Sequence, residues 1–177
     1  MNPEQAAFFL QVTLPVLERE HRITKKMIER VPADKSDYCP DACSKNALDL
    51  AWHLAWADNM FMSAAASGAF DFSDSKRPES VKNSADVASW YADRWSTIFE
   101  RLKQTPAEEL AKTIDFRGVL QQPAVLYLGL GMHHTIHHRG QLSVYLRPMG
   151  AKVPSIYGES YDDAQARKAT QAQSSIA

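Results

Sequence analysis

The sequence predicts an all-α protein that folds as a four-helix bundle, and three observations support this. Glycine accounts for only 7 of the 177 residues, and long stretches are rich in alanine and leucine. No convincing segment alternates apolar and polar residues as a half-buried strand does. Apolar residues instead recur at helical spacing in four long segments joined by moderate loops, which is the pattern of a four-helix bundle.

The first helix is expected over residues 3–31. Pro3 suits an early helical position, where its missing N–H costs nothing, and Pro32 stops the helix. Residues 34–43 then form a loop.

The second helix is expected to begin after Ser44, a good N-cap residue, and to end where Gly68 follows. Residues 69–82 form a polar connector. The third helix covers residues 84–104 and carries apolar residues at helical spacing. These are Val87, Trp90, Tyr91, Trp95, Ile98, Phe99 and Leu102.

The fourth helix follows a mixed stretch. Residues 105–109 resemble a short helical start, and residues 113–119 are expected to form a brief extended segment closed by Gly118. The fourth helix then covers residues 122–149 and ends at Gly150.

The four helices are expected to form one domain, residues 1–160, followed by a C-terminal tail over residues 161–177. The tail can form a helix from Asp162, and residues 169–177 are expected to fray. The sequence shows no internal repeat.

Composition excludes several classes of protein. The net charge of −1 gives no reason to expect nucleic acid or an anionic membrane as a partner. No run of about 18 apolar residues exists, so we expect no transmembrane helix. The N-terminus lacks the pattern of a secretory signal, and two cysteines are too few for a disulfide framework. We therefore expect a cytoplasmic protein.

Four of the six histidines fall within six residues, at positions 133, 134, 137 and 138. They make two pairs spaced four apart, His133 with His137 and His134 with His138. Residues four apart lie on one face of a helix, one turn from each other. Two such imidazoles can bind one transition metal, but they need at least one further ligand.

Helical phase distinguishes the two pairs. The face of His134 and His138 also carries Tyr127, Gly131, Leu142, Tyr145 and Met149. The opposite side carries Gly129, Arg139, Gly140, Ser143 and Arg147. His134 and His138 are therefore expected to point into the bundle, and His133 and His137 to lie toward a flank. Two stacked inward imidazoles would lack polar partners, and a metal would supply one.

His53 is the best candidate for a third ligand, because its helical face is mainly apolar and small. Taken alone, it would be a hydrogen-bonded core histidine. Three imidazoles suit Zn, Ni, Fe(II) or Mn, and they leave a position open for water or another ligand, as in catalytic zinc sites. His21 lies among four charged residues and is expected at the surface.

The same residues carry a resemblance to the DinB/YfiT family of metal-binding helical bundles. The matching strings are Ala-Trp-His-Leu-Ala around His53 and His-Thr-Ile-His-His-Arg-Gly-Gln-Leu over residues 134–142. The strings Tyr-Leu-Arg-Pro-Met-Gly at residues 145–150 and Val-Pro-Ser-Ile-Tyr-Gly at residues 153–158 follow at the expected place. The resemblance covers almost the whole chain in element order.

The resemblance implies a four-helix bundle with an up-down-down-up arrangement, commonly dimeric, in which His53, His134 and His138 are the metal ligands. Related proteins include thiol-dependent transferases and isomerases that use low-molecular-weight thiols. We therefore expect a homodimer that acts on a small molecule, with a thiol as a possible co-substrate. Fold does not by itself give function.

Several other residues could have either a functional or a purely structural role. Asp49 could orient His53 or serve as a base, or be a solvated helical residue. Arg139 and Gln141 could contact substrate, although Arg139 could equally lie at the surface or an interface. Cys39 and Cys43 could complete a Cys2His2 zinc site with the inward pair, Cys43 could be a reactive thiol near a helix N-terminus, or both could be ordinary loop cysteines.

Three further expectations concern packing. Gly140 is expected to allow close helix packing, because glycine costs about 1 kcal/mol relative to alanine within a helix. Arg147 is expected to form a salt bridge. The four tryptophans, Trp52, Trp56, Trp90 and Trp95, could line a substrate pocket, but tryptophan at helical spacing more often packs in a core or interface.

Two functions compete at this stage. The first is a metal-dependent hydrolase or thiol transferase that uses a three-histidine site with an open position for water or thiol. The second is a non-enzymatic, metal-stabilised helical bundle with a stress-related binding role.

Overall fold

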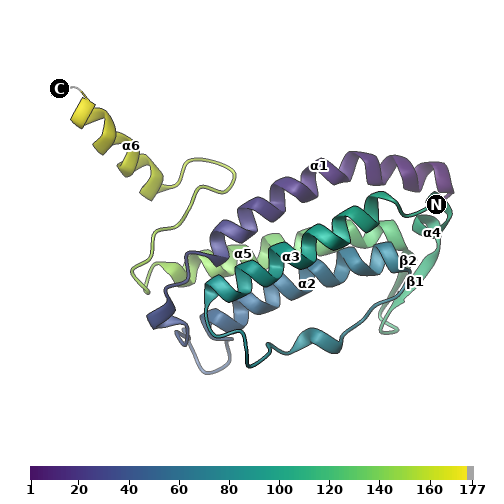
Figure 1. Cartoon of the computed structure of the whole chain (residues 1–177), viewed down its shortest axis with the longest axis horizontal. Coiled ribbons are helices and arrows are strands. Elements are labelled where there is room, and N and C mark those ends of the chain that lie inside the picture. The colour runs from purple at the N-terminus through teal and green to yellow at the C-terminus, as the bar shows by residue number, and fades with distance from the viewer. Residues whose placement is uncertain (175–177) are drawn as a thin grey trace.

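The structure is a computed structural model that describes residues 1–174, and it is mostly helical (Figure 1), which confirms the predicted fold class. Four long helices pack against one another: α1 (Pro3–Ile28), α2 (Ala47–Ser67), α3 (Ser84–Lys103) and α5 (Tyr127–Leu146). The shorter elements are η1 (Ala33–Lys35), η2 (Ser73–Ser75), α4 (Ala107–Ala111), β1 (Thr113–Phe116), β2 (Leu120–Pro123), η3 (Ala124–Leu126) and α6 (Tyr161–Ser174). The up-down-down-up order and the division at residue 160 stay predictions.

Asparagine side chains begin three of the long helices. Asn2 and Asn83 each form a capping box at the start of α1 and α3, and Asn46 accepts a hydrogen bond from the third backbone N–H of α2. Such caps satisfy N–H groups that have no partner within the helix. Ser44, the predicted N-cap of α2, instead donates a hydrogen bond of 2.7 Å to Asp41 in the preceding loop. The N-cap prediction was therefore wrong by two residues.

A two-stranded hairpin replaces the predicted start of the fourth helix. β1 and β2 pair antiparallel, and Arg117 and Gly118, both with positive φ angles, form the turn between them. Gln122 lies in β2, and α5 begins only at Tyr127. Pro123 gives the physical reason, because the residue before a proline is driven away from helical geometry toward extended backbone. The predicted extended segment is present, and its partner strand was missed.

The core lies between the facing sides of the four long helices. Its fully buried aliphatic residues include Met27, Ile28, Leu50, Leu54, Leu102, Leu128, Leu142 and Leu146. These residues come from all four helices, so the helices share one continuous core. In the described part of the chain, no helix combines the length and the apolar character that crossing a membrane would require.

The C-terminal helix α6 extends away from the rest of the molecule and buries no residue (Figure 1). Its first turn is held by an ion pair of 2.7 Å between Arg147 and Asp162, which confirms the predicted salt bridge of Arg147. The stretch predicted to fray is helical as far as Ser174, and its last residues, 175–177, lie outside the described residues.

Candidate metal centre

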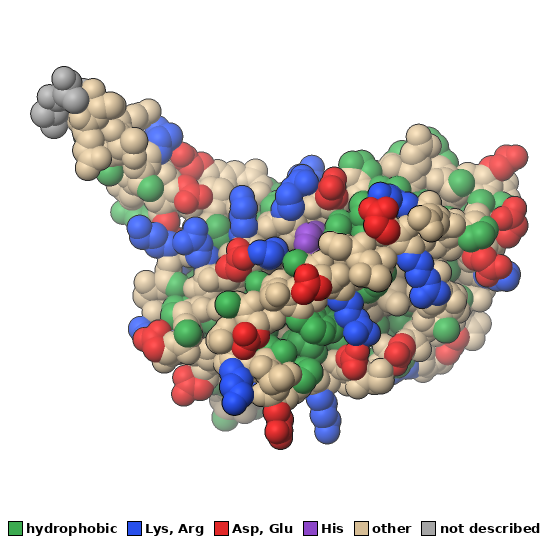
Figure 2. All heavy atoms as spheres, viewed as in Figure 1, with side chains coloured by type: hydrophobic (Ala, Val, Ile, Leu, Met, Phe, Trp, Pro, Cys, Tyr) green, Lys and Arg blue, Asp and Glu red, His purple; other side chains and the backbone are tan. Residues whose placement is uncertain are grey.

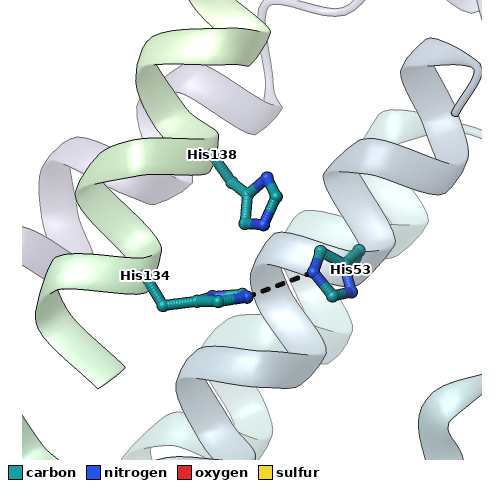
Figure 3. Close-up of side chains that lie close together, drawn as sticks. All are labelled: His53, His134 and His138. Carbon is teal, nitrogen blue, oxygen red and sulfur yellow. Dashed lines mark hydrogen bonds between the residues drawn. The ribbon is translucent and has the colours of Figure 1, made fainter. Parts of the chain in front are cut away.

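Three histidines from two helices converge between α2 and α5 (Figure 3). His53 comes from α2, and His134 and His138 lie one turn apart on α5. One ligand nitrogen from each residue lies within 4.8 Å of the other two. The three rings are half-buried, so the cluster is neither sealed in the core nor spread on the surface. Helical phase therefore placed these three side chains correctly, and together they could hold a metal ion.

The distance between two of the ring nitrogens fits a shared metal ion. Nε2 of His53 and Nε2 of His134 lie 3.2 Å apart (Figure 3). Two imidazole nitrogens bound at the usual zinc distance with tetrahedral geometry would lie about 3.3 Å apart. The two side chains thus have a separation that suits one ion between them, without any movement of either helix.

The protonation of the cluster also suits metal binding. Burial, and then the neighbouring His138, lower the pKa of His53 to about 4. Burial, followed by the nearby histidines, lowers the pKa of His134 to about 3. The pKa of His138 is also lowered, chiefly by burial. The imidazoles are therefore neutral at pH 7, which is the state that binds a metal.

Gln141 orients one of the three rings. Its amide oxygen lies 2.9 Å from Nδ1 of His138 and can accept a hydrogen bond from that nitrogen. A donor at Nδ1 leaves Nε2 of His138 with a free lone pair, which is how outer hydrogen bonds fix the tautomer of metal-bound histidines. Gln141, predicted as a possible substrate contact, therefore contacts one of the three histidines and is not itself a member of the group.

A glycine next to the site allows the two helices to approach closely. A Cβ atom added at Gly131, one turn before His134, would lie only 2.6 Å from the Cβ of Phe61 on α2. The absence of a side chain therefore permits the short distance between α2 and α5 at the cluster. Gly140 was predicted for this role, and that prediction was wrong, because a Cβ there would meet no described atom within 4 Å.

Arg139 lies away from the ligands, in a second polar cluster. It was placed on the outward face of its helix, but it is 1% exposed and forms an ion pair of 2.7 Å with Glu20 of α1. It also donates to Thr24, and Tyr157 donates to the same Glu20 carboxylate over 2.8 Å. The prediction failed because α1 covers the side of α5 that faces away from α2.

Asp49 is also engaged by other residues. Its carboxylate accepts hydrogen bonds of 2.8 Å from Arg77 and from the side chain of Asn46. Asp49 is thus part of the helix cap of α2 and of an ion pair with the connector before α3.

His21 was predicted at the surface, and this prediction was wrong. It is 9% exposed and stacks on Trp95 of α3 at 4.1 Å between ring centroids. Burial, followed by the charges of Lys25 and Arg22, lowers its pKa to about 4. The helical spacing of Leu17, His21, Thr24 and Ile28, all buried, was the signal that the charged neighbours in the sequence concealed.

The remaining candidates lie apart from the cluster. His133 and His137 are exposed, as expected for flanking residues. Cys39 and Cys43 are exposed loop residues, and the metal-ligand group found among residues 1–174 includes neither of them.

Two phenylalanines beside the cluster, Phe61 and Phe72, were missed as site residues, whereas Trp56 was among the tryptophans named as possible pocket residues. Trp56 lies 6.1 Å from His53 and 6.5 Å from Phe72, and Phe61 lies 5.8 Å from His134, between ring centroids. Phe72 belongs to the connector that was described as polar. Phe70 and Phe72 could have shown that this connector packs against the helices, because two aromatic side chains are unfavourable in a fully solvated segment.

Comparison with known proteins gives a consistent result. The model of the DinB family matches residues 8–173. An uncharacterized protein of Bacillus subtilis, YjoA, is 29% identical over 133 residues, which cover 73% of this chain and 84% of YjoA. The crystal structure of that DinB-like protein superposes with a TM-score of 0.67 at 24% identity, over 83% of this chain and 98% of its own. The crystal structure of a DinB-like protein from Bacillus cereus has a TM-score of 0.67 and 23% sequence identity to this chain. The match covers 84% of this chain and 95% of the other.

Proposed function

The chain belongs to the DinB family, and on that premise we propose that it is a metal-dependent hydrolase or thiol transferase whose ligands are His53, His134 and His138. The observation that carries the proposal is the 3.2 Å separation of two neutral ring nitrogens beside a third. Without an ion, the same separation is that of a hydrogen bond between the two rings, and the third imidazole beside them supplies the further ligand that a metal needs. Zn, Ni, Fe and Mn all accept three imidazoles.

The ion, when bound, would supply Lewis-acid activation of a water or a thiol at a position that the protein leaves open. Neighbouring side chains orient one of the three histidines and lie beside the other two. Gln141 fixes the ring of His138, and the aromatic side chains of Trp56 and Phe61 cover part of the surface beside the ligands. A small-molecule substrate, a low-molecular-weight thiol and a homodimer remain predictions.

One observation favours the second candidate, a non-enzymatic metal-stabilised bundle with a stress-related binding role. Asp49 and Arg139, the residues that sequence analysis offered for proton transfer and substrate contact, are both held in ion pairs with other residues. An enzyme of this design would depend on the ion rather than on a protein acid or base. The binding role requires no such group at all.

The experiment that separates the two candidates is the absorption spectrum of the Co²⁺-loaded protein during titration with 2-mercaptoethanol. We expect a new thiolate-to-cobalt charge-transfer band, because three protein ligands leave at least one coordination position for a further ligand. The variant His133→Ala should give the same band, and His134→Ala should give none. A cobalt spectrum that does not respond to the thiol or to added anions would favour the non-enzymatic bundle.

A further inference from the structure

A second pocket lies outside the histidine cluster, where α2 and α3 meet the connector that carries η2. Asn59 and Met60 of α2 are its buried residues, and the half-buried indoles of Trp56 and Trp90 come from α2 and α3. Its other lining residues are Ser63, Asp71, Ser73, Asp74, Arg94 and Ile98. Figure 2 shows hydrophobic surface between α3 and this connector, bordered by charged side chains.

Asn59 is the unusual residue of this pocket. It is 2% exposed, and neither its Nδ2 nor its Oδ1 has a hydrogen-bond partner among residues 1–174. Buried polar side chains almost always have a partner, because an unpaired donor or acceptor loses its hydration without compensation. A side-chain amide that keeps both a donor and an acceptor unpaired calls for a molecule that offers an acceptor and a donor in return.

The three charged residues of the pocket are exposed, and two of them form an ion pair. Arg94 forms an ion pair of 2.9 Å with Asp74 and lies over the ring of Trp90. Asp71 accepts a hydrogen bond of 2.9 Å from the backbone N–H of Ser73. The charge of Asp71 that has no ion-pair partner is therefore exposed, whereas the buried lining residues, Asn59 and Met60, carry no charge, and Asn59 is the buried polar group without a partner in the described structure.

The two indoles favour a flat ligand. Trp90 packs on Trp52 at 4.3 Å between ring centroids, and Trp56 lies near Phe72. Such contacts restrict the indoles, and planar rings stack on aromatic side chains in offset or edge-on arrangements. Trp56 also lies 6.1 Å from His53, so a molecule in this pocket would be separated from the histidine cluster by one side chain.

We propose that this pocket binds a small, uncharged aromatic or heteroaromatic ring that carries a primary amide or the equivalent lactam edge. The ring packs against Trp56 and Trp90. Both amide atoms of Asn59 are buried in this structure, so the side chain turns toward the pocket when the ligand binds. The ligand's N–H then donates to Oδ1 of Asn59, and its carbonyl accepts from Nδ2. This assignment requires no metal and stands independently of the proposed activity.

The test uses benzamide as the probe with the full chain, with and without added Zn²⁺. We expect saturable binding, measured by tryptophan fluorescence and by a shift of the Asn59 side-chain NH₂ signals in a ¹⁵N NMR spectrum. Acetamide has the amide without the ring, and methyl benzoate has the ring without the N–H. Both should bind at least about tenfold more weakly, since each lacks one of the two recognised features.

The variant Asn59→Leu should lose benzamide binding by about tenfold or more, and Gln11→Leu, the same type of change at an exposed position of α1, should not. If Asn59→Leu fails to fold, the NMR shift of Asn59 in the unmodified protein decides. Absence of benzamide binding, equal binding of methyl benzoate, or a crystal structure in which ordered water remains on Asn59 in saturating benzamide would each overturn the proposal.

Discussion

Two polar clusters attach α5 to its neighbours. One is complete, because its buried polar residues pair with one another, and the other is incomplete, because it keeps a buried polar atom without a partner in the described structure. On one side, Arg139 forms a buried ion pair with Glu20, and Thr24 and Tyr157 supply further hydrogen bonds. On the other side, three neutral imidazoles face one another, and Nδ1 of His134 is buried without a partner among the described residues. The polar residues of the first cluster hydrogen-bond to one another and link α5 to α1. The second cluster keeps one buried nitrogen without a partner, and its three histidines could hold a metal ion.

The largest effect should come from the complete cluster. Arg139→Ala removes the buried arginine that pairs with Glu20 and leaves that carboxylate with Tyr157 and the largely exposed Arg19 as its partners, and the free energy of unfolding should fall by about 3–5 kcal/mol. Urea denaturation measures this change. The control is Arg147→Ala, which removes an ion pair with Asp162 whose arginine is half exposed, and should cost no more than about 1 kcal/mol. Equal losses in the two variants would erase the distinction between a buried and a surface pair.

The incomplete cluster should respond to metal instead. Zn²⁺ at about 100 times its dissociation constant should raise the free energy of unfolding by about 2.7 kcal/mol, and a chelator should reverse this. Thermal melting with and without Zn²⁺ measures the effect. His134→Ala should abolish the response, and His133→Ala, an exposed neighbour on the same helix, should keep it. A Zn²⁺ response that survives His134→Ala would place the metal elsewhere.

Two glycines of α5 test whether helix approach supports the histidine cluster. Gly131→Ala places a Cβ against Phe61 and should cost about 1–3 kcal/mol in stability and weaken Zn²⁺ binding. Gly140→Ala meets open space in the described structure and should stabilise the helix by up to about 1 kcal/mol. Urea denaturation and Zn²⁺ titration of both variants give the answer. A harmless Gly131→Ala would show that the helices can move apart without loss.

The smallest effect near neutrality is that of pH on the metal-free protein. Burial lowers the pKa of His53 to about 4 and that of His134 to about 3, against 6.5 in the unfolded chain. Between these values the unfolded chain binds more protons, so stability falls as the pH drops from about 6.5 toward 4. Urea midpoints across this range measure the slope. The double variant His53→Ala/His134→Ala should have a shallower slope, and an unchanged slope would assign the effect to other groups such as His21.

The comparison also shows what helical phase can and cannot predict. Phase grouped His134 with His138 and singled out His53, because side-chain direction on a helix follows from spacing alone. Phase did not show that α1 covers the other side of α5, and Arg139 was therefore misplaced. Which helices are neighbours depends on the whole chain and cannot be read from one segment.

Local signals explain the other differences. The charged residues next to His21 outweighed its apolar helical spacing, although spacing decides which side of a helix is buried. The hairpin before α5 was half predicted, because β2 contains two glutamines and a proline and has no apolar alternation. Pairing with β1 forms that strand, and pairing is a property of two segments together.

The central claim is that the incomplete cluster is a metal site. Its most direct test is elemental analysis of the purified chain, with any tag removed, after loading with Zn²⁺ and removal of unbound ion. The account predicts about one ion per chain, lost in His53→Ala, His134→Ala and His138→Ala and kept in His133→Ala and His137→Ala. No bound ion in the unmodified protein, or the same content in all variants, would contradict it.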